Sequence, residues 1–99
     1  MQQAVFLHFT DHFPSADEIA RRVEERIGLK VESKLHVATA HHWLLSFAPN
    51  GQWNGIEAAE VFFNAREKRA SVELDSPPTK MQAAIVAALE AAGGVPWKG

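Results

Sequence analysis

The amino-acid sequence predicts a single α+β domain, residues 1–99, built as a two-layer sandwich of one mostly antiparallel sheet with both helices on one face. Two segments repeat apolar residues at every fourth position, which is the spacing of one side of a helix. Five other segments are rich in β-branched and aromatic residues, and most of them alternate between apolar and polar positions, as half-buried strands do. In chain order these segments read β-α-β-β-β-β-α. A ferredoxin-like arrangement is the alternative if one strand is assigned wrongly.

The first predicted strand, residues 4–9 (AVFLHF), is followed by a turn and the first helix. Ser15 is a favourable N-cap, and Glu18 three residues later completes the S-x-x-E pattern of a capping box. Gly28 is placed to end the helix in the left-handed conformation that glycine adopts readily. The apolar stripe of this helix consists of Ile19, Val23 and Ile27.

The next two segments, residues 29–37 (LKVESKLHV) and 41–47 (HHWLLSF), carry apolar residues at their odd positions. This period of two predicts a pair of strands joined by a hairpin near residues 38–40. No glycine or proline marks this turn. A three-residue loop is expected, because an odd loop length puts Val37 and Trp43 on the same face of the sheet.

Residues 48–57 (APNGQWNGIE) contain two Asn-Gly pairs, which are strong turn signals. They are predicted to form a long loop that displays Trp53. Residues 60–65 and 70–75 are then predicted to form a hairpin across the charged tip REKR. A pairing of Ala65 with Ala70 fits the apolar pattern of both strands, because it puts Phe63 opposite Val72 and Val61 opposite Leu74.

The second helix is predicted to begin after Ser76 as its cap, with Pro77 at the first helical position, where proline is favoured. Met81, Ile85 and Leu89 form its apolar stripe, and the pair Gly93-Gly94 ends it. The order of elements is similar to that of the TATA-binding-protein repeat unit, a likeness of topology alone. It implies an antiparallel sheet with both helices on one side.

With both helices on one side, the alternation along the strands divides their residues between two faces. The residues predicted to face the helices are Val5, Leu7, Phe9, Leu29, Val31, Leu35, Val37, Trp43, Leu45, Phe47, Val61, Phe63, Val72 and Leu74. The opposite face, called the outer face below, carries Phe6, His8, Lys30, Glu32, Lys34, His36, His42, Leu44, Ser46, Glu60, Phe62, Asn64, Ser71, Glu73 and Asp75. No predicted helix remains to cover the outer face.

The outer face is the predicted working surface, because it mixes apolar side chains with three of the five histidines. Apolar residues that gather in one patch mark interfaces or ligand sites, and homodimerisation is the commonest form of association. The sequence therefore predicts a small interaction or accessory domain that self-associates or binds a protein partner through this face. The residues of the predicted binding surface are Phe6, His8, His36, His42, Leu44 and Phe62, with Trp53 added as a recognition tip.

Composition excludes several other classes of function. The formal net charge of −2 and the sequence pI of about 6.2 argue against nucleic-acid binding, which draws its affinity from lysine and arginine. The absence of cysteine excludes thiolate metal sites and cysteine nucleophiles, and it is typical of a cytoplasmic protein. We expect no secretory signal and no membrane span, because the N-terminal apolar run is short and lacks a basic start. The sequence indicates no cofactor.

The alternative function is a small metal-dependent or His-based enzyme that uses the outer-face histidines. Imidazole and carboxylate groups suit several transition metals. However, the spacing of His8 and His12 brings side chains together only on a helix, and the neighbours His41 and His42 point to opposite faces of a strand. No catalytic motif accompanies them, so the sequence favours a protein that is not an enzyme and assigns no catalytic or metal-binding residue.

Overall fold

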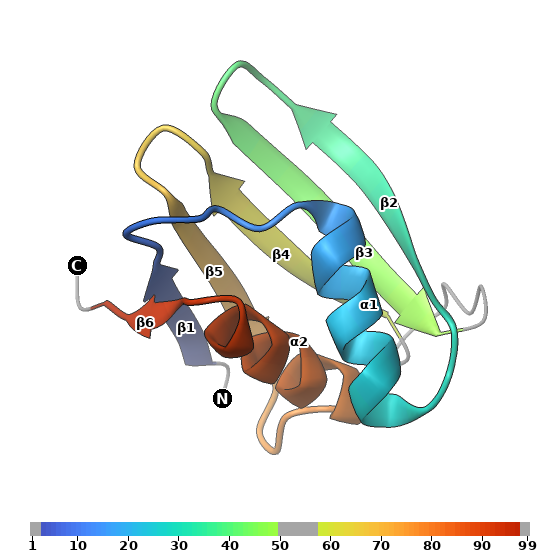
Figure 1. The fold of residues 1–99 in the computed structure, drawn as a ribbon. Helices are drawn as coiled ribbons and strands as arrows, with labels where there is room; N and C mark the ends of the chain where they lie inside the picture. The colour runs from blue at the N-terminus through green and yellow to red at the C-terminus, as the bar shows by residue number, and fades with distance from the viewer. Residues whose placement is uncertain (1–2, 50–57, 98–99) are drawn as a thin grey trace.

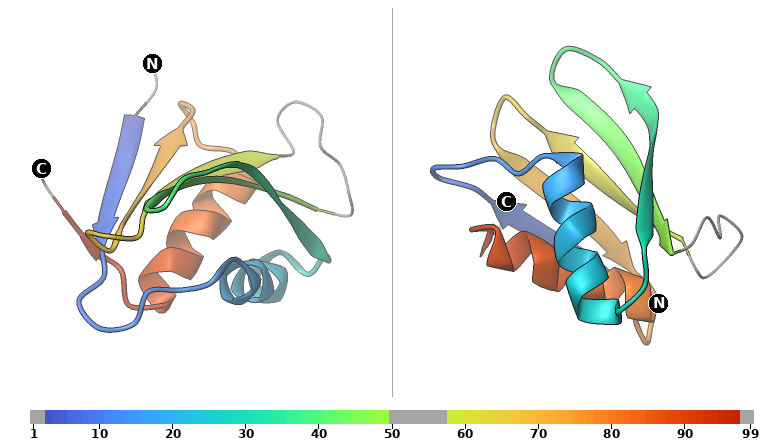
Figure 2. Two further views of the ribbon diagram at one scale, coloured as in Figure 1. Left: turned by 90° about the horizontal axis from the view of Figure 1, so that it is seen from above. Right: turned by 45° about the vertical axis from the view of Figure 1, so that its right-hand side comes forward.

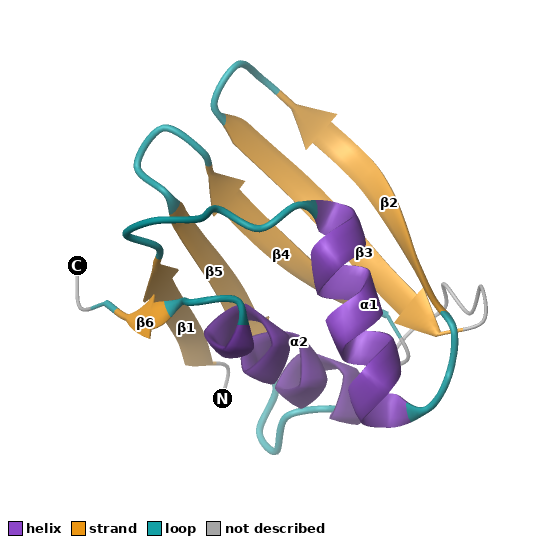
Figure 3. Cartoon of the chain, in the orientation of Figure 1, coloured by secondary structure: helices purple, strands orange, loops and turns teal. Residues whose placement is uncertain are grey.

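The computed structural model describes residues 3–49 and 58–97, which fold into a sheet layer and a helix layer (Figure 1). The elements in chain order are β1 (Gln3–His8), α1 (Ala16–Ile27), β2 (Val31–Ala38), β3 (His42–Pro49), β4 (Ala59–Asn64), β5 (Arg69–Leu74), α2 (Lys80–Ala91) and β6 (Val95–Pro96). The strands form one antiparallel sheet in the order β2-β3-β4-β5-β1-β6. The colouring by secondary structure in Figure 3 shows the two layers most directly.

Both helices pack on the same face of the sheet, as the views in Figure 2 show. The predicted α+β sandwich and its order are confirmed, with one addition. The short strand β6, which was not predicted, pairs with β1 and places the chain after α2 at the edge of the sheet. The predicted loop of residues 48–57 is only partly tested, because Ala48 and Pro49 belong to β3 while residues 50–57, with Trp53, lie outside the described residues.

Helix α1 begins and ends where the sequence predicts. The Ser15 side chain accepts a hydrogen bond from the backbone N–H of Glu18, and Gly28 has the left-handed φ of 72° that ends the helix. A Glu24 carboxylate oxygen then accepts the N–H of Val31 at 2.9 Å, which ties the start of β2 to the helix. The predicted stripe packs inward, with Ile19 and Val23 buried and Ile27 half-buried.

The predicted cap of α2 is wrong. The N-cap is Thr79 rather than Ser76, and it forms a complete capping box: the Thr79 hydroxyl oxygen accepts the Gln82 backbone N–H, and Gln82 Oε1 accepts the Thr79 backbone N–H. The T-x-x-Q pattern satisfies two orphan N–H groups of the first turn, whereas a helix begun at Ser76 would have no such reciprocal pair. The stripe of Met81, Ile85 and Leu89 is buried, as predicted.

A β-bulge in β2 overturns part of the predicted division into faces. Leu35 pairs with Leu45, but Val37 pairs with Leu44, so His36 and Val37 together oppose one residue of β3. The extra residue turns Val37 onto the outer face, where 52% of it is exposed. Val37 and Trp43 therefore lie on opposite faces, contrary to the expectation from loop length.

Two other residues assigned to the core are exposed. Leu29 precedes β2, which begins at Val31 rather than at residue 29, and 46% of its surface is accessible. Leu35 keeps the predicted helix-side orientation, yet it is 55% exposed.

The turn after β2 is stabilised by a side chain rather than by glycine or proline. The hydroxyl oxygen of Thr39 accepts the backbone N–H of His42 at 3.0 Å, a hydrogen bond typical of turns that begin with serine or threonine.

The hairpin of β4 and β5 has a four-residue loop, but its register differs from the predicted one by two residues. Phe63 pairs with Ala70 and Asn64 with Arg69, so the loop spans residues 65–68 and Lys68 takes a positive φ of 54°. A shift of two residues leaves every side chain on its predicted face, because the side-chain period of a strand is two. The hydrophobic pattern therefore could not distinguish the two registers.

The core lies between the sheet and the two helices. The largest fully buried side chains come from β1 and its extension, from α1, from the three central strands and from α2. They are Phe9, Phe47, Leu7, Ile19, Ile85, Leu89, Val23, Val61 and Val72. The helices thus cover one face of the sheet, and no helix covers the outer face on the other side (Figure 2).

Candidate functional site

A row of mostly apolar residues crosses the outer face from one side of the sheet to the other. Val37 of β2 is paired with Leu44 of β3, and Leu44 is paired with Phe62 of β4. Phe62 is paired with Ser71 of β5, and Ser71 with Phe6 of β1. Directly paired residues of antiparallel strands have touching side chains. Residues far apart in the sequence therefore form one continuous surface.

Trp97 extends this row beyond β1. Its backbone N–H donates to the Phe6 carbonyl at 2.9 Å, and its indole meets the Phe6 ring edge-on at a centroid distance of 6.3 Å. The guanidinium carbon of Arg69 lies 3.6 Å from the centroid of the Trp97 ring, a cation–π contact. We call this set the apolar row: Val37, Leu44, Phe62, Ser71, Phe6 and Trp97.

The apolar row has a hollow where its one small polar member, Ser71, lies. The hollow has a volume of about 300 Å³, and Phe6, Phe62 and Trp97 stand around it. Phe62 and Phe6 are 55% and 46% exposed beside it. Protruding rings next to a hollow give the surface relief, so the side chains of a facing surface can interdigitate with it.

Charges of opposite sign flank the apolar row. On one side, Ser46 pairs with Glu60 of β4 and with Lys34 of β2, and Glu73 pairs with Ala4. On the other side, His42 and Arg69 both pair with Asn64, and His8 pairs with Arg69. One side of the row thus carries Glu60, Glu73 and Lys34. The other side carries two histidines and Arg69, which forms an ion pair with Glu67 at 3.2 Å.

The histidines predicted for this site lie on the outer face but do not assemble. His36, at the bulge, lies 2.7 Å from the Ser46 hydroxyl through its Nε2 atom. His8 and His42 occupy the other side of the apolar row, on strands separated by β4 and β5. Within residues 3–49 and 58–97, no three His, Asp or Glu side chains come close enough to hold a metal ion. The metal-dependent form of the enzyme alternative therefore has no assembled metal site within these residues.

His12 instead forms a local hydrogen bond with Glu18. Its Nε2 atom lies 2.6 Å from Glu18 Oε1, and Arg22 Nε lies 3.4 Å from Glu18 Oε2. The hydrogen bond with His12 is the largest cause that lowers the pKa of the Glu18 carboxyl below its ordinary value of 4.5, and Arg22 adds to it while burial opposes it. The Glu18 carboxylate does not accept the backbone N–H of Ser15, so the predicted capping box is incomplete, and the carboxylate links the turn before α1 to the helix through His12 instead.

Glu18→Gln is expected to change how stability depends on pH. A carboxyl with a lowered folded pKa contributes stability above its unfolded pKa near 4.5, and this is lost as the pH falls through the lower folded value. The wild type should exceed the variant in free energy of unfolding near neutral pH, and the difference should shrink in acid. Urea unfolding of both proteins across this range measures it. A difference that stays constant from neutral to strongly acidic pH would contradict the assignment.

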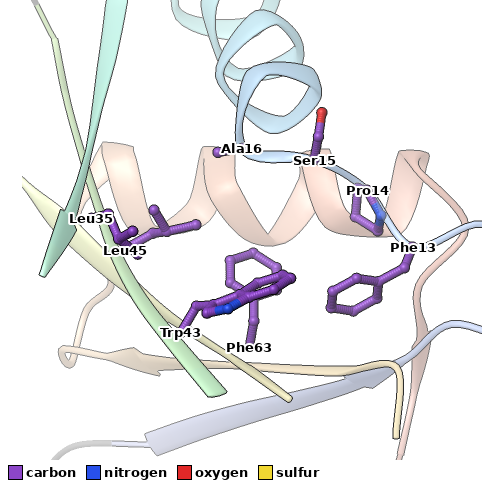
Figure 4. Close-up of a pocket in the computed structure, with 8 residues that line it drawn as sticks. All are labelled: Phe13, Pro14, Ser15, Ala16, Leu35, Trp43, Leu45 and Phe63. Carbon is purple, nitrogen blue, oxygen red and sulfur yellow. The ribbon is translucent and has the colours of Figure 1, made fainter. Parts of the chain in front are cut away.

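Sequence reasoning missed a second open surface, an apolar pocket on the helix side of the β2–β3 hairpin (Figure 4). We call it the aromatic pocket. Its volume is about 410 Å³. Its lining residues are Phe13, Pro14, Ser15, Ala16, Leu35, Trp43, Leu45 and Phe63. Leu35, Trp43, Leu45 and Phe63 were assigned to the core, and Phe13 was not assigned to any site.

A length comparison in the sequence could have signalled this pocket. Helix α1 has 12 residues and rises about 18 Å at 1.5 Å per residue, and it runs at a slant along β2 and β3 (Figure 1). Strands β2 and β3 have eight residues each, about 26 Å at 3.3 Å per residue. The helix therefore leaves the tip of the hairpin uncovered, with Leu35 and Trp43 near that end.

No helix of the described residues is long and apolar enough to cross a membrane. Comparison of the chain with protein-family models, with curated proteins and with solved structures finds no match.

Proposed function

We propose that this chain is a small self-associating interaction domain, in which two copies pack against each other through the apolar rows of their outer faces. The observation that carries the proposal is the continuity of this row across β2, β3, β4, β5 and β1. The proposal includes the cytoplasmic location expected for a chain without cysteine.

The hydrophobic effect supplies the driving force. Val37, Phe62 and Phe6 are each about half exposed in the single chain, at 52%, 55% and 46%. Fully burying such a side chain is worth about 1.5–3 kcal/mol. Scattered apolar residues on a surface need no explanation, but a contiguous row of them on a sheet face without helices is typical of an interface.

Charge complementarity favours a second copy as the occupant. A two-fold axis that runs along the apolar row exchanges its two flanks, so that Glu60 and Glu73 of each copy face Arg69 of the other, which also pairs with Glu67 of its own chain at 3.2 Å. Opposite charges then meet on both sides of the buried row, and the same contact occurs twice, as a two-fold interface requires. Sheets that pack face to face in this way lie about 10 Å apart.

Sedimentation equilibrium and light scattering on the wild-type chain test the proposal. We expect the mass to rise from one chain to two as the protein concentration increases, and the self-association to weaken little with added salt because its centre is apolar. A mass of one chain at every concentration would overturn the proposal. A concentration-dependent mass with a dissociation constant insensitive to outer-face substitutions would overturn the assigned surface.

A further inference from the structure

The aromatic pocket lies on the opposite side of the sheet from the apolar row, and self-association makes no use of it. We propose that it binds an uncharged aromatic molecule of two to three rings. Its lining comes from the turn before α1, the first residues of α1 and strands β2, β3 and β4 (Figure 4). A ligand there would complete the core at the tip of the β2–β3 hairpin, which α1 does not reach.

The walls of the pocket are held in place by ring contacts. Phe13 meets the Phe63 ring edge-on at a centroid distance of 5.6 Å and the Phe9 ring at 5.5 Å, and Trp43 lies tilted at 6.4 Å. Phe9 and Phe63 are buried, so they fix the position of Phe13 from behind. In Figure 4 the rings of Trp43 and Phe63 lie on one side of the space and the first residues of α1 on the other. A preformed slot of this kind costs a ligand little ordering of side chains.

The lining decides the charge of the ligand. No Asp, Glu, Lys, Arg or His side chain is among the eight lining residues. The Ser15 hydroxyl already accepts the backbone N–H of Glu18 at 3.2 Å. An ionised group would lose its hydration there without gaining a partner of opposite charge, which is strongly unfavourable. An uncharged ligand is therefore the chemical match.

The volume of the pocket and its aromatic lining indicate the size and the aromatic character of the ligand. A cavity of about 150 Å³ holds one benzene ring, so the volume of about 410 Å³ suits two to three rings. Aromatic pairs in offset or edge-to-face contact gain about 0.5–1.5 kcal/mol beyond the burial of their area. Three ring-bearing walls therefore favour an aromatic ligand over an aliphatic chain of equal volume.

The probe for the test is the uncharged dye phenylnaphthylamine, whose emission rises in apolar surroundings. The test variant is Leu35→Lys, which puts an ammonium group at the mouth of the pocket. Its matched control is Val37→Lys, because Val37 is on the same strand and nearly as exposed but lies on the other face. We expect saturable binding by the wild type, a dissociation constant at least about tenfold higher for Leu35→Lys, and little change for Val37→Lys.

A second variant keeps the test decisive if Leu35→Lys does not fold. Ala16→Leu adds carbons that fill the space from the first turn of α1, at a position where leucine is a good helix former, and it should weaken binding of the dye similarly. Competition with naphthol and decanol tests the ligand class, and naphthol should displace the dye more strongly. No saturable binding, an equal effect of both lysine variants, or equal displacement by decanol would overturn the proposal. Val37→Lys should weaken self-association but leave dye binding unchanged. Dye binding and self-association are therefore measured separately, and either proposal can fail without the other.

Discussion

Replacing Phe62 with aspartate is expected to convert the self-associated protein to a monomer. Phe62 lies at the centre of the apolar row, between Leu44 and Ser71, and its ring is 55% exposed in the single chain. A carboxylate at this position would be buried in the interface without a partner, next to the existing charge of Glu60. Loss of a central anchor costs about 2 kcal/mol or more, so the dissociation constant should rise at least about 30-fold by sedimentation equilibrium.

Leu29→Asp is the matched control for this substitution. Leu29 is also an exposed apolar residue, at 46%, but it lies in the turn between α1 and β2, away from the apolar row. It should leave the dissociation constant unchanged. If Leu29→Asp and Phe62→Asp weaken self-association equally, or if neither does, the outer face is not the interface.

Replacing Phe47 with alanine is expected to lower the free energy of unfolding by about 3–5 kcal/mol. Phe47 is fully buried on the helix side of β3, where it packs with the other core residues. Truncation removes the transfer free energy of the ring and leaves a cavity that a close-packed core fills only in part. Urea unfolding, monitored by circular dichroism, measures the change.

Phe62→Ala is the matched control, because it deletes the same ring from the neighbouring strand on the opposite face. In a protein solution dilute enough to be monomeric, it should cost less than about 1 kcal/mol, since its ring is largely in water in the single chain. Similar losses for the two alanine variants would mean that the outer face is covered within the monomer, contrary to the structure.

Local patterns predicted the helices well because each helix is set by its own residues. The spacing of the apolar stripes, the Ser15 cap and the left-handed Gly28 all act within one turn of chain. The misplaced cap of α2 has a local reason too. Ser76 and Thr79 both suit an N-cap, and only Thr79 is followed at the third position by a glutamine that closes the box.

The strands were harder to predict because their pairing involves residues that are distant in sequence. The bulge at His36 moves one residue, Val37, from the predicted core face to the outer face, and nothing in the alternation of residues 29–37 announces it. The bulge also improves the candidate site. It brings a second aliphatic side chain next to Leu44 and so lengthens the apolar row toward the edge of the sheet.

The members of the candidate site were predictable, but their arrangement was not. Alternation placed Phe6, Leu44 and Phe62 on one face, whereas the sheet order determines that they adjoin. Trp97 joins them only because β6 pairs with β1. Strand β6 has only two residues, too few to give a recognisable pattern in the sequence. The aromatic pocket depends on where α1 packs on the sheet, which no single segment of the sequence determines.

Isotope-filtered nuclear Overhauser measurements on a mixture of labelled and unlabelled chains test the central claim most directly, because they detect only contacts between copies. The account predicts contacts between copies from the side chains of Val37, Leu44, Phe62 and Phe6, on the outer face. Contacts confined to the helices or to the edge of β2, or none in a protein concentrated enough to associate, would contradict it.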